Sequence, residues 1–288
     1  QLTGPYEGVV VDGNNIYSAI TAAELSGKTL KPAFIAQVAI EVTPETFAEK
    51  LAAATPGTIL KLAAGTYAGA EFNVEYVTIQ GPNAGIAGTA ERAEEAVFTE
   101  PIKILAKGIT LDGIKLDTAA NVEINADNAT ITNVLSLAYG NGTVTGVNRK
   151  AALFTNKAIA NVEVSNSYFN IGTSTYCKGV WSSSETLTNA KFINNLFTHD
   201  SDAQGSISDC IAIYNVAGKV DFIGNKFIWV TDDWDIMFGV YSNNCDEINV
   251  IDNNFIGKTV EGSELYTCGI MLRCAPAGCE VNVIHNYF

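Results

Sequence analysis

The chain has 288 residues, a hydrophobic content of 47% and a formal net charge of −14 at pH 7. An acidic balance of this size disfavours nucleic acid and anionic membrane surfaces as partners, because both attract a basic protein face. No apolar run approaches the ~18 residues of a membrane span, and no basic segment followed by an apolar stretch opens the chain, so we expect any signal peptide to have been removed.

Residues 1–42 are expected to form an N-terminal extension, because they share no repeat with the rest of the chain. Gly8–Asn15 has the pattern of a strand followed by a turn, and Phe34–Ile40 has the pattern of another strand. The extension is therefore predicted to contain strands that precede the main fold.

A short amphipathic helix is predicted in the segment 43–57. Thr43 is a favourable N-cap, and Pro44 suits the first helical position. Pro56–Gly57 ends the helical pattern. We therefore predict a helix over 44–54 that covers the open end of the coils that follow it. Its apolar stripe consists of Phe47, Leu51 and Ala54.

From residue 58 onward, one sequence motif, here called the phrase, recurs at nearly constant spacing. The phrase alternates apolar and polar residues and ends in phenylalanine, as in Ala190–Phe197 and Val220–Phe227. A near-fixed period between about 20 and 50 residues indicates a solenoid. The closing phenylalanines are separated by 28, 30, 28 and 33 residues and are Phe169, Phe197, Phe227, Phe255 and Phe288.

The pattern within each repeat indicates the kind of solenoid. Alternation with a period of two predicts a strand with one buried face. A second short strand, such as Cys210–Tyr214, follows in the repeats, and no helical pattern separates them. We therefore predict an all-β fold, a parallel β-helix over 58–288, whose coils stack about 4.8 Å apart.

Two ladders of identical side chains are expected from this stacking. The closing phenylalanines should lie on one another inside the coil as offset aromatic pairs. Asparagine tolerates turn geometry, and its amide can bond to the asparagine above and below it, so a column of asparagines is predicted to be structural. Four of them stand two positions before a closing phenylalanine: Asn195, Asn225, Asn253 and Asn286.

The entry to the repeat resembles a known group of proteins. A helix, then Pro56–Ile59, then Ala64–Tyr67 is similar to the entry of the secreted right-handed parallel β-helix proteins of the pectate lyase-like superfamily. Ile79–Ile86 and Ile109–Gly113 resemble the cell-surface branch more closely than the polysaccharide lyases. The resemblance implies a right-handed coil and an extracellular or cell-surface location. It assigns no activity, because one fold hosts many functions.

The six cysteines form no CxxC pair, which disfavours zinc ribbons and thioredoxin chemistry. An even number in an acidic chain of secreted appearance predicts disulfides, and buried free thiols are the alternative. Three pairings are expected: Cys177 with Cys210, which align in adjacent coils, Cys245 with Cys279, and Cys268 with Cys274, which requires a turn between them. A pairing of Cys274 with Cys279 is the alternative to the pairing of Cys268 with Cys274.

Two acidic loops follow consecutive ladder phenylalanines, Phe197 and Phe227. Adjacent coils should bring these loops together, and stacked carboxylates repel unless a hard cation or water separates them. The alternative is a solvated acidic turn above core tryptophans. The candidate ligands for calcium, the one cofactor that the sequence suggests, are Asp200, Asp202, Asp232, Asp233 and Asp235.

One segment resembles a signature of pectin methylesterases. Gly218–Gly224 matches that signature in part but lacks its additional phenylalanine and its companion Gln-Asp and Arg-Pro-Trp motifs. Asp221 occupies a repeat position that holds Glu163 and Lys191 in other coils. A position that varies in this way is predicted to point outward and to be structural, so no catalytic residue is assigned.

Two classes of function are compatible with these patterns. We favour a non-catalytic extracellular structural or adhesive protein, whose partners are copies of itself joined head to tail or surface glycans. We favour this function because Phe288, a core-facing residue, lies in the last coil. An open solenoid end exposes apolar core and unpaired strands, which another molecule could cover. The N-terminal strands could add to a neighbour's open coil. The alternative is a polysaccharide-active lyase or hydrolase, or a glycan-binding surface protein.

Overall fold

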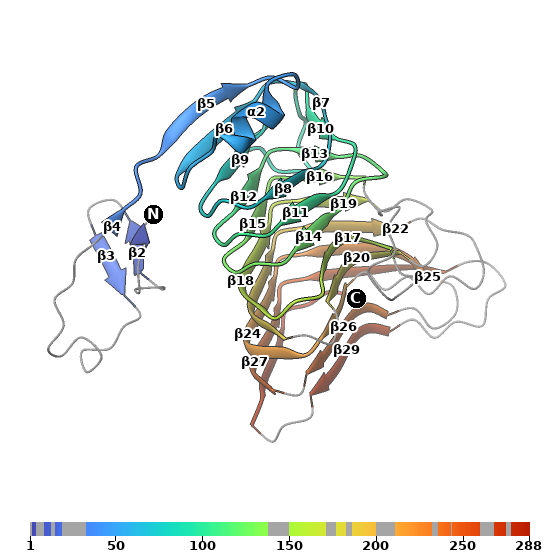
Figure 1. Cartoon of the computed structure of the whole chain (residues 1–288). Helices are drawn as coiled ribbons and strands as arrows, with labels where there is room; N and C mark the ends of the chain where they lie inside the picture. The colour runs from blue at the N-terminus through green and yellow to red at the C-terminus, as the bar shows by residue number, and fades with distance from the viewer. Residues whose placement is uncertain are drawn as a thin grey trace, which may run out of the picture.

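The computed structural model of the chain describes residues 2–3, 9–12, 15–18, 33–137, 150–170, 177–182, 186–199, 211–231, 236–242, 244–259, 268–274 and 278–288. The chain winds as a stack of coils, and each full coil contributes one strand to each of three parallel sheets (Figure 1). The predicted parallel β-helix is therefore confirmed.

Sheet 1 has ten strands, all parallel to their neighbours. Most of its strands show the predicted alternation of buried and exposed residues, because every second side chain faces the inside of the coil. Its strands are β5 (Val38–Val42), β6 (Thr58–Leu62), β9 (Thr78–Gln80), β12 (Thr110–Asp112), β15 (Thr130–Thr132), β18 (Ile159–Ser165), β21 (Leu187–Ile193), β24 (Val216–Ile223), β27 (Asn244–Ile251) and β30 (Glu280–Ile284).

Sheets 2 and 3 have eight parallel strands each. Sheet 2 consists of β7 (Gly65–Tyr67), β10 (Ala96–Phe98), β13 (Lys115–Leu116), β16 (Leu135–Ser136), β19 (Tyr168–Asn170), β22 (Leu196–His199), β25 (Lys226–Thr231) and β28 (Asn254–Thr259). Sheet 3 consists of β8 (Ala70–Phe72), β11 (Ile102–Ile104), β14 (Val122–Ile124), β17 (Lys150–Thr155), β20 (Cys177–Ser182), β23 (Ile211–Tyr214), β26 (Ile236–Ser242) and β29 (Cys268–Cys274).

The N-terminal extension contains two small antiparallel pairs. β1 (Leu2–Thr3) pairs with β4 (Ala33–Phe34), and β2 (Val9–Asp12) pairs with β3 (Asn15–Ser18). Figure 1 shows these strands to one side of the coils. β5 instead pairs in parallel with β6, so five residues of the segment 1–42 belong to the largest sheet.

The interior of the coil is apolar and aromatic. The ladder phenylalanines stack with nearly parallel rings: the centroids of Phe169 and Phe197 are 5.0 Å apart, and those of Phe227 and Phe255 are 4.8 Å apart. A second stack joins Phe192 of β21 to Phe222 of β24 at 4.9 Å. Burial of these rings stabilises the coils that contain them, because aromatic side chains remove a large apolar area from water.

The turn from sheet 1 to sheet 2 requires a left-handed residue in many of the described coils. This position is filled by glycine or by the polar residues that tolerate a positive φ, because other side chains would clash with the backbone there. The structure places it directly after the strand of sheet 1 and before the ladder asparagine. Its occupants, the corner column, are Gly113, Asn133, Asn166, Asn194, Gly224, Asp252 and His285.

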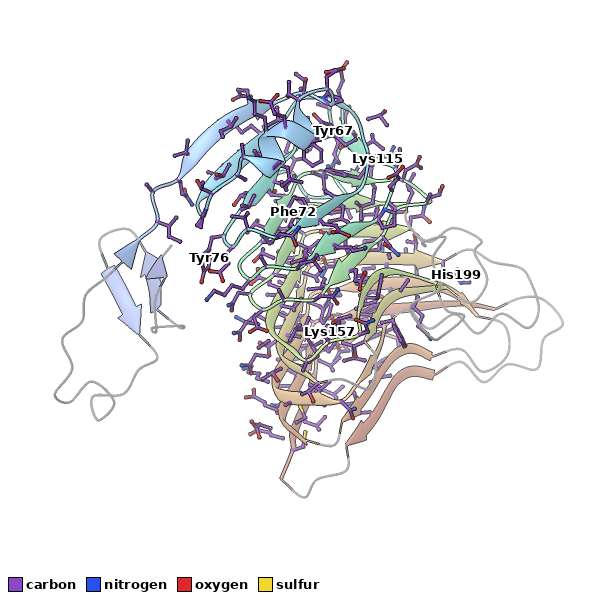
Figure 2. The ribbon with its side chains drawn as sticks, in the orientation of Figure 1. Tyr67, Phe72, Tyr76, Lys115, Lys157 and His199 are labelled. Atoms are coloured by element: carbon purple, nitrogen blue, oxygen red, sulfur yellow. The ribbon has the colours of Figure 1, made fainter. Side chains whose placement is uncertain are left out.

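The capping helix is shorter than predicted. α2 spans Phe47–Ala52, and residues 44–46 form a turn rather than the first helical turn. The hydroxyl of Thr46 accepts a hydrogen bond from the Thr43 N–H at 3.0 Å, which closes that turn and delays the helix. The cap still covers the first coil, because Phe47 packs edge-on against Tyr67 at a centroid distance of 5.3 Å. Figure 2 shows Tyr67 at this end of the stack.

Candidate functional site

The four predicted ladder asparagines form one continuous chain of hydrogen bonds. Each Nδ2 donates at 3.0 Å to the Oδ1 of the next asparagine, from Asn195 to Asn225, Asn253 and Asn286. Each Nδ2 also donates to a backbone carbonyl, as Asn225 does to Phe192 at 2.9 Å. The first three side chains are buried, so their amides hold the coils together and are not presented to a ligand.

The predicted calcium ligands Asp200, Asp202, Asp232, Asp233 and Asp235 lie outside the described residues. The strands that lead into these loops are neighbours, since His199 of β22 pairs with Trp229 of β25. Within the described ranges, no group of three or more His, Cys, Asp or Glu side chains is arranged to hold a metal ion. The calcium site stays a prediction.

Two of the cysteine predictions are wrong. Cys279 is a thiol that is bonded neither to Cys245 nor to Cys274. The reason for Cys245 is register: β27 and β30 pair from Glu247 with Glu280, so Cys245 and Cys279 do not stand opposite each other. Cys245 Sγ instead lies 3.4 Å from the carbonyl oxygen of Gly218.

The pairing of Cys268 with Cys274 is also wrong. The two residues begin and end β29, which is extended throughout. Six residues of extended strand separate their Cα atoms by about 20 Å, well beyond the reach of a disulfide. Cys177 lies in β20, and Cys210 lies outside the described residues, so their pairing stays a prediction.

Asp221 is less exposed than its outward-pointing repeat position predicts. It is on the outer face of sheet 1, as its repeat position predicts, but it is only 7% exposed. Asn249 of the next coil donates to its Oδ1 at 2.7 Å, and the Lys219 Nζ lies 3.6 Å from the same oxygen. Neighbouring polar side chains therefore enclose this carboxylate, which serves to join β24 to β27.

The same network perturbs two ionisable groups. A hydrogen bond from Asn249 and another from Lys219 lower the pKa of Glu247. The bond to Glu247, aided by the charge of Asp221, raises the pKa of Lys219 despite partial desolvation. Both shifts favour the charged forms, so the outer face of these coils is held by a charged pair across β24 and β27, whose Nζ and Oε1 atoms are 3.1 Å apart.

Two residues that the sequence suggested for a sugar-active site, Lys178 and Trp181, are not presented to solvent. Lys178 and Trp181 of β20 are both buried, with at most 5% of their surface exposed. Phe154, which pairs with Trp181, is buried as well. Rings in this state cannot stack on a sugar face, so the aromatic residues here serve packing.

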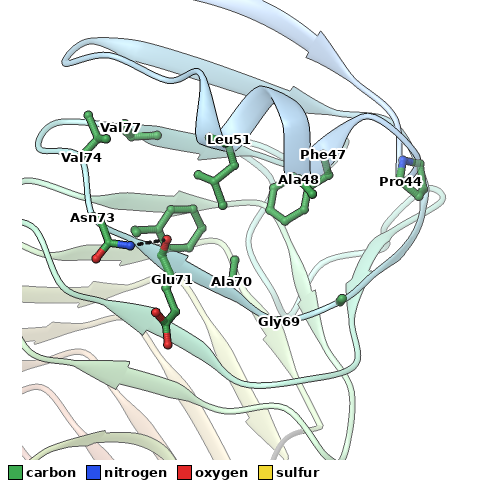
Figure 3. A pocket seen from close by; sticks show the side chains of 13 residues that line it. Pro44, Phe47, Ala48, Leu51, Gly69, Ala70, Glu71, Asn73, Val74 and Val77 are labelled. Atoms are coloured by element: carbon green, nitrogen blue, oxygen red, sulfur yellow. Dashed lines mark hydrogen bonds between the residues drawn. The ribbon is translucent and has the colours of Figure 1, made fainter.

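A hollow of about 500 Å³ lies between the capping helix and β8 (Figure 3). Its helix side is apolar and includes Phe47 and Leu51, and its opposite wall is Phe72, Val74 and Val77. The helix packs on Tyr67 through the ring of Phe47, and the Tyr67 hydroxyl donates to the Ala63 carbonyl at 2.8 Å. The sequence predicted the helix but not this hollow, whose existence depends on how the helix and β8 diverge.

β8 borders this hollow with an open edge. It is the last strand of sheet 3, with only β11 beside it among the described strands. The Ala70 N–H and the Phe72 carbonyl bond toward β11, and because successive residues of a strand alternate sides, the N–H and carbonyl of Glu71 face the hollow. Among the described residues, the carbonyl of Glu71 accepts only a long 3.4 Å bond from the Asn73 side chain. This edge is therefore able to accept another strand.

The last coil of the stack presents apolar side chains. β30 is the last strand of sheet 1, and its residue Val283 is 50% exposed. Phe288 continues the ring stack at 5.2 Å from Phe255 yet is 79% exposed. An exposed strand edge with apolar side chains attracts further strands, whether they come from the same polypeptide or from another molecule.

One long loop was not anticipated from the sequence. Residues 81–95, here called the strap, fold over the corner between sheets 1 and 2 and contact three successive coils. Arg92 donates to the carbonyl of Asn133 at 2.6 Å and to that of Ile114 at 3.3 Å, and Gly88 donates to that of Asn166 at 2.8 Å. The one available signal was spacing, since this coil is longer than the next one.

No protein-family model, curated protein or solved structure matches this chain. None of the helices in the described residues has the length and apolar character needed to cross a membrane.

Proposed function

We propose that this chain is a non-catalytic structural or adhesive protein of the extracellular space or cell surface, which joins copies of itself head to tail. The observation that carries the proposal is the open edge of β8 beneath α2. An extended segment placed there gains backbone hydrogen bonds from Glu71 and buries apolar side chains against Phe72 and Leu51, which is the physical basis of strand addition.

The finer assignment is to the right-handed β-helix proteins of the pectate lyase-like superfamily, in their cell-surface branch. It is supported by the entry motif Ala64–Tyr67, in which Gly65 begins β7 and Tyr67 packs against Phe47 of the cap. A structural function is further supported by the charged side chains, several of which connect neighbouring coils. Lys103 and Glu71, for example, pair at 2.7 Å between β11 and β8.

The donor of the added strand is proposed to be the N-terminal extension of a second copy. β2 is rich in valine, and its four residues exceed the length of the three-residue edge of β8 by one. The acceptor and the donor are then different surfaces of one molecule. Such a contact is head to tail, and unless its rotation closes a ring it produces a filament.

The test uses one substitution at the acceptor edge. Glu71→Pro removes the N–H that faces the hollow, whereas proline is tolerated on an unpaired strand edge. Glu71→Ala is the matched control, because it loses the same ion pair with Lys103 but keeps the N–H. We expect light scattering and electron microscopy to show assemblies of the unmodified chain and of Glu71→Ala, and their loss in Glu71→Pro.

A second arm removes the donor. Deletion of residues 1–34 leaves β5 in place and should abolish assembly, while addition of the unmodified chain should not restore long filaments of the truncated one. A chain that stays monomeric at high concentration, or one whose assemblies ignore both changes, contradicts the proposal. Binding to a glycan array by a chain that does not assemble would favour the glycan-binding alternative instead.

A further inference from the structure

The corner between sheets 1 and 2 has the same backbone geometry in successive coils, but the strap covers only part of it. Each corner-column residue is followed by a residue that begins the turn into sheet 2. The strap occupies the column at Gly113, Asn133 and Asn166. Beyond these coils the column continues through Asn194, Gly224 and Asp252, and all of these residues are described.

The strap makes its contacts through donors. The Arg92 guanidinium spans two coils by donating to the Ile114 and Asn133 carbonyls, and its side chain is only 4% exposed. The Gly85 N–H donates to the Asp112 carboxylate at 3.1 Å. This corner therefore binds the strap by offering acceptors to the donors of Arg92, Gly88 and Gly85.

The uncovered coils present the same acceptors. The carbonyls of Asn194, Gly224 and Asp252 accept no hydrogen bond from any described residue, although their equivalents in Asn133 and Asn166 are bonded to the strap. These residues lie one coil apart; Asn194 and Asp252 are exposed, and Gly224 is half-buried. The carboxylate of Asp252 adds negative charge to this row, since its nearest described partner is His285 at 3.6 Å.

The residue before each corner-column position changes character where the strap ends. In the covered coils it is polar, and in the uncovered coils it is isoleucine on the outer face of the sheet. Three of these side chains are half-buried, and Ile284 is 42% exposed. The polar residues are Asp112, Thr132 and Ser165, and the apolar ones are Ile193, Ile223, Ile251 and Ile284.

We propose that this uncovered corner binds an extended segment of a partner polypeptide that carries arginine beside an apolar residue. The arginine takes the place that Arg92 takes on the strap, and the apolar residue packs on the isoleucine row. The four isoleucines span three coil steps, about 14 Å, which four to five extended residues cover. The occupant continues an interface that the chain already makes with itself.

Charge and geometry both select arginine. The corner-column carbonyls of Asn194, Gly224 and Asp252 are acceptors, the Asp252 carboxylate adds negative charge, and the whole chain has a net charge of −14, so a cationic donor is attracted to them. A planar guanidinium holds its N–H groups in a fixed fork that bonds two carbonyls of adjacent coils at once, as Arg92 does. A lysine ammonium lacks this geometry and is more strongly hydrated, so it should bind less well.

The strap itself supplies the probe. A fluorescein-labelled peptide with the sequence of residues 81–95 is titrated into the full chain and followed by fluorescence anisotropy. We expect saturable binding, at least tenfold weaker for the peptide with Arg92→Ala and intermediate for the peptide with Arg92→Lys. Anisotropy that stays unchanged up to about 1 mM peptide, a concentration that detects even weak complexes, overturns the proposal.

Two variants of the full chain locate the binding. The double variant Ile223→Asp, Ile251→Asp should lose at least tenfold in peptide affinity, because it places two carboxylates in the apolar row. Leu105→Asp is the matched control, since Leu105 is 40% exposed, directly follows β11 of sheet 3 and should leave the affinity unchanged. Equal binding by the double variant would show that the peptide displaces the chain's own strap, and it overturns the proposal.

A second measurement covers the case in which the double variant does not fold. A photoreactive benzoylphenylalanine at the position of Ile86 in the peptide should crosslink the unmodified chain within residues 216–259. Crosslinks confined to residues 113–168 overturn the proposal. A polysaccharide as the natural occupant would appear as a glycan-array signal that the double variant loses, together with no response to the peptide, and this result also overturns it.

Discussion

Arg92 and Asn133 are separated by 41 positions in the chain, yet the guanidinium of one donates a 2.6 Å hydrogen bond to the carbonyl of the other. The same guanidinium pairs with Glu95 through Nε at 2.8 Å, and both side chains are largely buried. One residue therefore fastens the strap to two coils, and its positive charge is compensated within the strap.

Replacement of Arg92 by alanine should destabilise the chain. The change leaves the Glu95 carboxylate buried without its partner and removes two bonds between coils, which we expect to cost about 3 kcal/mol. Arg92→Lys keeps the charge but not the planar fork and should cause an intermediate loss. Chemical denaturation of both variants measures this, and an alanine variant as stable as the unmodified chain would contradict the description of the strap.

The asparagine ladder predicts a similar sensitivity at Asn225. Its amide donates to Asn253 and Phe192 and accepts from Asn195. Asn225→Ala therefore leaves several buried polar groups without this hydrogen-bond partner. We expect a loss of about 3 kcal/mol. The control is Asn254→Ala, at a half-buried position one place past the ladder, which should cost less than about 0.5 kcal/mol. Equal losses in thermal or chemical denaturation would mean that the ladder is not stabilising.

Two glycines of the strap corner separate backbone strain from crowding. Gly113 and Gly85 both have positive φ, at 69° and 76°. A Cβ on Gly113 would lie 2.1 Å from the Ala84 nitrogen, whereas one on Gly85 meets nothing within 4 Å. Gly85→Ala should therefore cost about 1 kcal/mol, the penalty of the left-handed conformation. Gly113→Ala should cost about 3 kcal/mol, because overpacking is added to that strain. Matching stabilities would refute the close contact.

The stability of the cap should fall at alkaline pH because of Tyr67. Burial, with a smaller effect of the Glu45 charge, raises the pKa of Tyr67 to about 12. The folded state thus favours the protonated phenol: its contribution is complete below the ordinary value of about 10 and is lost as the pH rises from 10 toward 12. Tyr67→Phe loses the bond to Ala63 but should abolish this dependence. Denaturation midpoints between pH 8 and 12 test this, and parallel curves for both chains would exclude the assignment.

The repeat could be predicted from the sequence because it arises from residues that are close together in the chain. Alternation within a strand and the recurrence of Phe197, Phe227 and Phe255 both follow from what each coil must bury, and neither requires knowledge of distant residues. The parallel β-helix follows from that period. The ladder asparagines could be predicted for the same reason, since the amides in a column of stacked asparagines can hydrogen-bond to one another.

Features that depend on contacts between distant segments were not accessible. Nothing near Arg92 indicates that its partners are Ile114 and Asn133, because the strap's path is decided by the coils it crosses. Asp221 was correctly placed on the outer face, but its enclosure depends on Asn249 of the next coil. The start of α2 was misplaced because the Thr43–Thr46 turn outcompetes the first helical turn, a balance of a few hydrogen bonds.

The amide ladder also has a consequence for length. Asn225 donates to Asn253 the same hydrogen bond that it accepts from Asn195. The asparagines inside the column are therefore equivalent in their bonding. A duplicated segment of one whole coil would insert between two existing rungs and leave every amide satisfied. A partial coil would break the column and shift one phenylalanine off its stack. The molecule can therefore be lengthened in whole turns only, each adding the same increment of about 4.8 Å.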